Sequence, residues 1–338
     1  MNSLCGLQNL GNTCYINSVL QCLAHTRPLL NIILDDDIIS RIDTTRKPSD
    51  LIRELSSAFK LLRDAGPERR AMSPIRLINT IRILAHKLER DSFAGHGQND
   101  AHEFAWFLID NIHEALARKV SISYTGKPTT FLGNLAVKSI ENWKLHFSGC
   151  HSDIITSFYA QSIAMIRCLT CGHQSFSFDP VCHMSVPVGD SDCSIEECMD
   201  TYVKPEILDG DNAWMCEKCG VKRAAHRSHL FWNIPETFML VLKKFRGATQ
   251  KINSRVSFDK TINMSKYVMT PSKTGWMYQP FAIVNHYGSL NSGHYTARIL
   301  KDDDSWKNYD DMAVTDHTAS PVGHENYIIF IRKIAVPT

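Results

Sequence analysis

The sequence has almost no excess of charge of either sign, because 37 Lys and Arg residues face 35 Asp and Glu residues among 338. Proteins whose main partner is a nucleic acid need a clustered positive excess, so this near balance argues against that class. No apolar run approaches the roughly 18 residues of a membrane-spanning helix, and the longest, around residues 29–34, is broken by Asn31. The sequence thus predicts no nucleic-acid partner and no membrane span.

The first residues also lack the basic patch and apolar stretch of a secretory signal peptide. We therefore expect a reducing, intracellular location, in the cytoplasm, the nucleus or both. The 11 cysteines agree with this expectation. Their odd number is a poor disulfide framework, which leaves metal binding or catalysis as their usual uses.

The spacing of apolar residues changes along the chain. It is mostly helical from about residue 14 to 118, whereas alternating, β-rich segments dominate from about residue 154. Four segments are typical of strands: 237–245, 281–286, 294–300 and 327–331. This segregation predicts an α+β fold in which a helical lobe meets a sheet lobe and forms a cleft.

A turn rich in Gly and Asn precedes Cys14 and runs into an amphipathic segment. With Asn12 or Thr13 as N-cap, Cys14 falls in the first helical turn, where the helix dipole and free amides stabilise a thiolate. We therefore predict a lowered thiol pKa and a nucleophilic Cys14. The same amides, with the side chain of Asn9, would hydrogen-bond an oxyanion. A free cysteine is more often an inert core residue, so this interpretation depends on a matching base.

His294 is the candidate base because it borders a glycine-bounded loop and starts a predicted strand. An antiparallel pairing that turns at residue 302 places Asp310 opposite His294, within one residue. Asp310 would then accept the Nδ1 proton and leave Nε2 to take the thiol proton. His286 is a rival base, and Asp311 is either an alternative carboxylate partner or a support for the oxyanion side.

Two C-x-x-C pairs, each followed by glycine, lie far apart in the sequence and consist of Cys168, Cys171, Cys216 and Cys219. Paired knuckles of this kind are typical of a tetrahedral Cys₄ zinc site. We expect the ion to join two hairpin tips as a structural strap; two unrelated turns with buried cysteines are the alternative. Three other cysteines lack this spacing and are expected in the core or at the surface: Cys182, Cys193 and Cys198.

The segment 98–104, Gln-Asn-Asp-Ala-His-Glu-Phe, opens a helical stretch that runs to about residue 116. Asp100 and Glu103 fit an N-cap and capping-box pair. If these groups face the cleft, they would instead hold a basic extended peptide. The spacing alone leaves both interpretations open.

Taken together and in this order, these segments resemble the ubiquitin-specific proteases, papain-like cysteine peptidases that cleave after the C-terminus of ubiquitin. The similarity extends from about residue 5 to 333 and includes 6–21, 98–104, both knuckles, 240–245, 293–297, 306–311 and 327–330. It implies a single catalytic domain shaped like a right hand. A helical thumb (about 1–150) would carry Cys14, β fingers with part of the palm (about 151–235) would bind zinc, and a β palm (about 236–338) would carry His294 and Asp310.

The resemblance also implies an activity, that of a thiol isopeptidase which hydrolyses the bond after the C-terminal glycine of ubiquitin. Asn9 would lie in the oxyanion hole, and Gln98, Asp100 and Glu103 would line the channel for the ubiquitin tail. Loops near 249–255 and 289–293 would correspond to the family's mobile loops over that tail.

The expected cofactor is structural Zn²⁺, with no organic cofactor, and the expected partner is ubiquitin or a ubiquitin-like protein and its conjugates. A protease for a ubiquitin-like modifier and a non-catalytic ubiquitin-binding scaffold are the alternatives. We expect a monomer, and the sequence leaves open whether a protein partner activates it.

Overall fold

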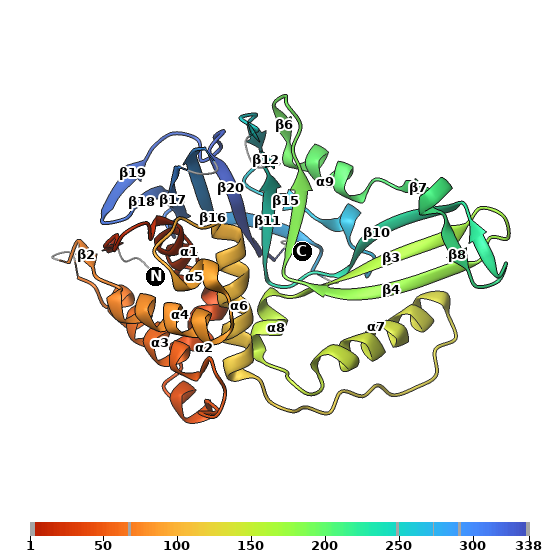
Figure 1. Cartoon of the computed structure of the whole chain (residues 1–338), viewed down its shortest axis with the longest axis horizontal. Coiled ribbons are helices and arrows are strands. Elements are labelled where there is room, and N and C mark those ends of the chain that lie inside the picture. Colours follow the sequence, from red (N-terminus) through yellow and green to blue (C-terminus); the bar gives the residue numbers. More distant parts are fainter. Residues whose placement is uncertain (1–3, 67–68, 248–249, 273, 290–291, 336–338) are drawn as a thin grey trace.

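The computed structural model describes residues 4–66, 69–247, 250–272, 274–289 and 292–335 (Figure 1). Most helices precede most strands along the chain, which confirms the predicted α+β class. Residues 249, 290 and 291, which belong to the two loops predicted to cover the substrate tail, lie outside the described residues.

The helical lobe is built around α1 (Cys14–Ala24), whose residues are all buried. The apolar face predicted for residues 51–62 forms α3 (Ser49–Arg63), and α3 packs on α4 (Ile75–Lys87) and α6 (Ala101–Leu116). The shorter helices α2 (Arg27–Ile33), α5 (Asp91–Ala94) and α8 (Asp153–Phe158) belong to the same lobe, whereas α9 (Ile195–Val203) packs on the sheet lobe. Because α1 also packs against the sheet strand β17 (Gly293–Leu300), it joins the helical lobe to the sheet.

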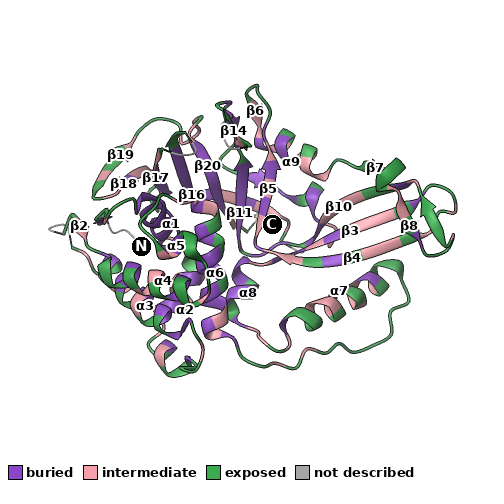
Figure 2. Ribbon diagram, viewed as in Figure 1, coloured by how far each residue is buried: buried purple, intermediate pink, exposed green. Residues whose placement is uncertain are grey.

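The palm is one mixed sheet with the strand order β19-β18-β17-β16-β20-β11-β5, and β15 (Ile262–Asn263) pairs with β16. The other strands are β5 (His183–Pro187), β11 (Thr237–Lys243), β16 (Met277–Gly288), β18 (Trp306–Asp310), β19 (Ala313–His317) and β20 (Asn326–Lys333). Figure 2 shows that β11, β16 and β20 are mostly buried. The central strands therefore form a rigid support for β17.

A second sheet, of order β4-β3-β10-β7, extends away from the palm (Figure 1). Its strands are β3 (Ala160–Cys168), β4 (Gln174–Val181), β7 (Glu206–Leu208) and β10 (Ala225–Asn233). Helix α7 (Phe131–Phe147) packs mainly on this sheet, since Leu135 shares a small core with Ile163, Phe178 and Trp232. At the end of α7, the ring of Phe147 also contacts His113 of α6.

The largest apolar core runs continuously from the helical lobe into the palm. It includes Val19 of α1 and Phe104 of α6 together with Val284 of β16 and Ile328 of β20, all fully buried. The lobes are therefore halves of one folding unit. In the described part of the chain, every helix is too short or too polar to span a bilayer.

Candidate active site

Cys14 is the first residue of α1, as predicted, and Thr13 is the N-cap. The Thr13 side chain does not cap the helix; its hydroxyl oxygen instead accepts a hydrogen bond from the Leu10 amide (2.9 Å). The amides of the first helical turn are thus free of side-chain caps. Cys14 and Tyr15 amides donate to the thiol sulfur, together with the amide of Tyr295 in β17.

The pKa of the Cys14 thiol is raised, so the predicted lowering is wrong for this resting geometry. Burial is the largest cause, because only 3% of the residue is exposed, and the negative charge of Asp311 adds to it. The three backbone amides lower the pKa but do not compensate for the lost hydration. Before the reaction Cys14 is therefore a neutral thiol that needs a base.

His294 and Asp310 are in contact, as predicted, with 2.6 Å between His294 Nε2 and Asp310 Oδ1. The register differs from the predicted one: Arg298 pairs with Asn308, and continuing this ladder places Asp310 opposite Thr296. The reason is a larger turn, in which the Lys301 amide donates to the Ser305 carbonyl. His294 therefore lies diagonally from Asp310 on the same face of the sheet.

This diagonal placement also reverses the predicted roles of the ring nitrogens. Nε2, at the far end of the imidazole, reaches Asp310, whereas Nδ1 was expected to do so. The carboxylate accepts the Nε2 proton, which leaves Nδ1 as the basic nitrogen. Among the described residues no hydrogen bond joins the His294 ring to Cys14. The amide of Tyr295, the residue after His294, nevertheless lies close enough to the Cys14 sulfur to lower its pKa. Catalytic contacts of this kind often tighten only when substrate binds.

Asp311 contacts Asn9, the residue predicted for the oxyanion side, and not the candidate base. Its carboxylate accepts hydrogen bonds from the side-chain amides of Asn9 and Asn17, both at 2.8 Å. Asn9 Oδ1 accepts the amides of Gly11 (3.0 Å) and Thr13 (3.2 Å), so the orientation of the Asn9 amide group is fixed at both ends. Sequence reasoning missed Asn17, although its position one helical turn after Cys14 is a signal that it faces the same side.

The turn that carries Asp311 touches the segment before Cys14. Asp311 has a positive φ of 47°, and its carbonyl accepts the Leu7 amide (2.8 Å). A Cβ atom on Gly6 would lie 2.4 Å from the Met312 carbonyl oxygen. Only glycine permits this approach, which brings together two segments from opposite ends of the chain.

Asp100 is the N-cap of α6, because its Oδ1 accepts the amides of His102 (2.8 Å) and Glu103 (3.0 Å). Its Oδ2 accepts the hydroxyl of Tyr327 in β20 (2.6 Å). Burial and the charges of Asp100 and Glu103 raise the pKa of Tyr295, so both carboxylates lie close to the residue beside Cys14. The capping role is therefore confirmed for Asp100, and its acidic charge also faces the site.

Gln98 reaches from the segment before α6 to the start of β17. Its Nε2 donates to the Gly293 carbonyl (3.0 Å), and its Oε1 accepts the Gly293 amide (3.2 Å). The rival base His286 is buried against this residue, and a Cβ atom on Gly293 would lie 2.1 Å from its Nε2. His286 therefore packs against the residue before His294, whereas His294 is the histidine that contacts Asp310.

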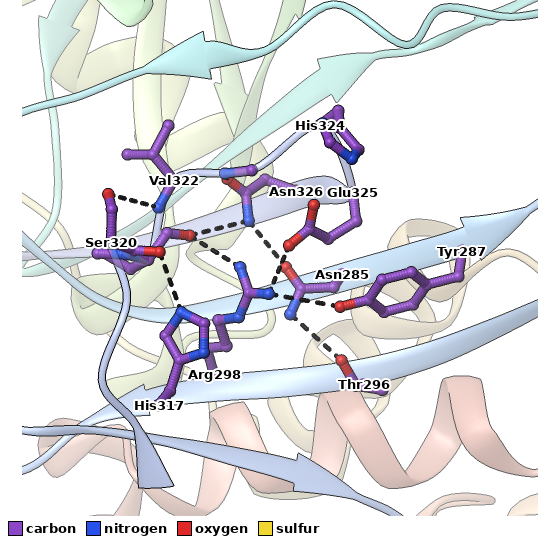
Figure 3. A network of polar contacts seen from close by, with 12 residues as sticks. Asn285, Tyr287, Thr296, Arg298, His317, Ser320, Val322, His324, Glu325 and Asn326 are labelled. Atoms are coloured by element: carbon purple, nitrogen blue, oxygen red, sulfur yellow. Dashed lines mark hydrogen bonds and ion pairs between the residues drawn. The ribbon is translucent and has the colours of Figure 1, made fainter.

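A buried polar network holds β17 in place between its neighbours (Figure 3). Arg298 of β17 forms an ion pair with Glu325 and donates to the Pro321 carbonyl (3.0 Å). Asn285 of β16 donates to Thr296 (3.2 Å) and accepts a hydrogen bond from Asn326 (2.8 Å). Since Thr296 is two residues from His294, this network fixes the strand that presents the candidate base.

The four knuckle cysteines lie together at the far end of the second sheet. Cys168 ends β3 and Cys171 lies in the turn that follows; Cys216 ends β8 (Trp214–Cys216) and Cys219 lies in the turn before β9 (Val221–Arg223). Their sulfur atoms all lie within 4.8 Å of one another, with 3.6 Å between Cys171 and Cys216. The glycines that follow, Gly172 and Gly220, have φ values of 70° and 69°. The two turns thus form one cluster that could hold a metal ion.

A family model described as ubiquitin carboxyl-terminal hydrolase matches residues 5–331. Ubiquitin carboxyl-terminal hydrolase Usp2 of Drosophila melanogaster is 30% identical over 341 residues, which cover 98% of this chain and 35% of the relative. Probable ubiquitin carboxyl-terminal hydrolase 4 of Schizosaccharomyces pombe is 31% identical over 329 residues, which cover 91% of this chain and 54% of the relative. The chain thus spans about a third to a half of the length of these two curated relatives.

Among solved structures, the SAGA Ubp8/Sgf11/Sus1/Sgf73 DUB module bound to ubiquitin aldehyde contains a chain with the same fold. The TM-score is 0.75 at 22% identity, and the match covers 98% of this chain and 70% of the other. The predicted hand-shaped fold and the predicted resemblance are therefore confirmed. The chain belongs to the ubiquitin carboxyl-terminal hydrolase family.

Proposed function

We propose that this protein is a thiol isopeptidase that hydrolyses the bond after the C-terminal glycine of ubiquitin. The observation that carries the proposal is the position of Cys14 at the start of α1, which packs against β17, the strand that carries His294 in contact with Asp310. A buried thiol, an imidazole and a carboxylate in this order form the constellation of nucleophilic acyl transfer. Family membership supports ubiquitin as the substrate.

In the proposed reaction, His294 Nδ1 takes the Cys14 proton as the sulfur attacks the glycine carbonyl. Asp310 holds the imidazole in the required tautomer and stabilises the imidazolium ion that forms. Asn9 and the Cys14 amide donate to the oxyanion of the tetrahedral intermediate. His294 then protonates the departing amine, and water releases the acyl-enzyme.

We propose that Gln98, Asp100 and Glu103 border the channel for the ubiquitin tail. Asp100 and Glu103 bring negative charge close to Tyr295, the neighbour of His294, in a protein whose net charge is only +2. A basic extended tail would be attracted there. Local charge, and not the charge of the whole chain, would thus select the substrate.

We also propose that Cys168, Cys171, Cys216 and Cys219 bind a structural Zn²⁺. Thiolates placed 2.3 Å from one ion in a tetrahedron are about 3.8 Å apart, which the sulfur cluster matches. All four ligands come from the chain, so the ion would fasten two hairpin tips and leave no position for a substrate. Lewis-acid or redox chemistry is not assigned to it.

A ubiquitin-like modifier in place of ubiquitin is the second candidate, because surface detail across the second sheet and the channel decides the choice. A scaffold without catalysis is the third, although Cys14, His294 and Asp310 are all present. We further propose a monomer that acts in the cytoplasm or nucleus, where thiols stay reduced. A panel of modifiers with electrophilic C-termini would show which of them labels Cys14.

Turnover of a ubiquitin–aminocoumarin conjugate by the Cys14→Ala variant tests the activity. We expect hydrolysis to be abolished while binding of ubiquitin persists. Cys150→Ser is the matched control, because Cys150 is a partly exposed lone thiol three residues after α7 whose loss should leave the rate unchanged. Undiminished hydrolysis by Cys14→Ala would refute the assignment.

A further inference from the structure

Cys193 and Cys198 form a pair of neighbouring thiols that includes neither Cys14 nor any of the four knuckle cysteines. Their sulfur atoms lie 3.4 Å apart, although nothing in the sequence spacing predicts a site. Cys193 belongs to β6 (Cys193–Ser194), and Cys198 is the fourth residue of α9. The pair therefore spans the start of a helix.

The backbone at this helix start is already fixed. Ser194 and Glu197 form a complete capping box, in which the Ser194 amide donates to Glu197 Oε2 (2.7 Å) and the Glu197 amide donates to Ser194 Oγ (3.2 Å). Cys193 directly precedes the N-cap, and Cys198 is the fourth residue of the helix. Side chains at these two positions meet in a hydrophobic staple. The two sulfurs thus face each other because of the cap, and small side-chain rotations would bring them to bonding distance.

The two thiols differ in reactivity. Cys193 is partly exposed, whereas Cys198 is 3% exposed. Burial and the hydrogen bond to Cys193 raise the pKa of the Cys198 thiol to about 12. Cys193 is thus placed as the attacking thiol and Cys198 as the resolving thiol.

We propose that Cys193 and Cys198 form a reversible disulfide, a modification site for small-molecule disulfides such as oxidised glutathione. The Cys193 thiolate attacks one sulfur of the oxidant and releases one glutathione thiolate, which gives a mixed disulfide. Cys198 then loses its proton, and its sulfur attacks the Cys193 sulfur and displaces the second glutathione. In total, two protein thiols are oxidised to one disulfide and one oxidised glutathione is reduced to two thiols.

The bond would fasten α9 to the strand pair at the edge of the palm. β6 pairs with β14 (Val256–Ser257), the Cys193 amide donates to the Arg255 carbonyl (3.1 Å), and the Ser257 hydroxyl donates to the Cys193 carbonyl (3.2 Å). Ile195 and Met199 of α9 are fully buried in the core beneath. The oxidised form should therefore resist unfolding of this helix start better than the reduced form.

The test equilibrates the zinc-loaded chain in glutathione buffers of increasing oxidised fraction, followed by alkylation of the remaining thiols. Digestion before aspartate residues isolates residues 192–199, which contain Cys193 and Cys198 and no other cysteine. We expect this peptide to lose two hydrogen atoms and both alkylation sites as the buffer becomes oxidising, and to regain them with dithiothreitol. The melting temperature should rise by a few degrees in the oxidised form.

Cys193→Ser and Cys198→Ser should each prevent the disulfide. Because Cys193 is partly exposed, its variant keeps the test valid if Cys198→Ser folds poorly. Cys150→Ser is the control and should behave like the wild type. Two alkylated thiols throughout the buffer series would overturn the proposal. A stable glutathione adduct on Cys193, with Cys198 still alkylated, would overturn it equally.

Discussion

Replacing Asp311 by Asn tests whether this carboxylate acts through Asn9. In the native site it accepts the amides of Asn9 and Asn17, both at 2.8 Å. An amide at position 311 keeps one acceptor oxygen but turns an NH₂ group towards the second donor, so one charge-assisted hydrogen bond is lost. Such a bond contributes about 1.5–3 kcal/mol, which corresponds to a loss of about ten- to a hundredfold in kcat if it only holds Asn9 in place.

The loss has an upper limit set by Asn9 itself. Removal of one oxyanion donor lowers kcat by about 10²–10³-fold, so Asn9→Ala should define the largest effect that Asp311→Asn can have. If Asp311 acts only through Asn9, the double variant should be no slower than Asn9→Ala alone. Initial rates with ubiquitin–aminocoumarin give kcat and KM, and thermal unfolding confirms that each variant is folded. Losses that multiply in the double variant would refute the reasoning.

Alkylation of Cys14 provides an independent readout. The negative charge of Asp311 contributes to the raised pKa of the thiol, so its removal lowers that pKa. The rate of reaction with iodoacetamide should therefore rise at lower pH in Asp311→Asn than in the wild type. Asp310→Asn is the matched control, because Asp311 is the carboxylate that raises the pKa of the Cys14 thiol, whereas Asp310 contacts His294; it should leave the alkylation profile in place and lower kcat through His294.

Metal and pH provide two further predictions. Cys168→Ser and Cys216→Ser should each lose the ion and lower the melting temperature, as elemental analysis and thermal unfolding would show; a well-folded wild type without zinc would contradict the metal site. Burial lowers the pKa of His183 and His286 from 6.5 to about 4. The folded state binds these protons less readily than the unfolded state, so the free energy of unfolding should fall as pH decreases from 6.5 towards 4, by about 1.4 kcal/mol per pH unit for each histidine. Denaturant titrations at several pH values measure this slope, and a flat profile would count against it.

Local patterns were sufficient to predict the parts of the site that depend on neighbours in sequence. The Gly- and Asn-rich turn predicts the start of α1 at Cys14, and the paired knuckles predict the sulfur cluster. The pKa of Cys14 could not be predicted, because its sign depends on how deeply the whole of α1 is buried by the palm. Desolvation is a property of the assembled fold, whereas the helix dipole is local.

The register around His294 shows a second limit. The sequence predicts that the strands carrying His294 and Asp310 are antiparallel. Which residues face each other depends on the number of residues in the turn between them, which a hydrogen bond from the Lys301 amide to the Ser305 carbonyl closes. A difference of two residues keeps the same face, so the contact with Asp310 survives while the ring nitrogen changes. The apolar spacing, which is helical only to about residue 118, does not predict helix α7, although Thr130 caps it through the Gly133 amide. Its partner sheet comes later in the chain.

Gln98 holds the residue before the candidate base, and we propose that it also borders the substrate channel. Its amide pairs with both backbone groups of Gly293, the residue before His294. Tail binding alone would raise KM in Gln98→Ala, whereas loss of positioning would lower kcat. Because both polar groups of the amide are engaged, we expect kcat to fall by about ten- to thirtyfold with little change in KM, since each neutral hydrogen bond contributes about 1 kcal/mol. Gln98→Glu keeps the acceptor for the Gly293 amide, so its kcat should lie between those of the wild type and Gln98→Ala. A raised KM with an intact kcat in Gln98→Ala would instead assign Gln98 to the substrate alone.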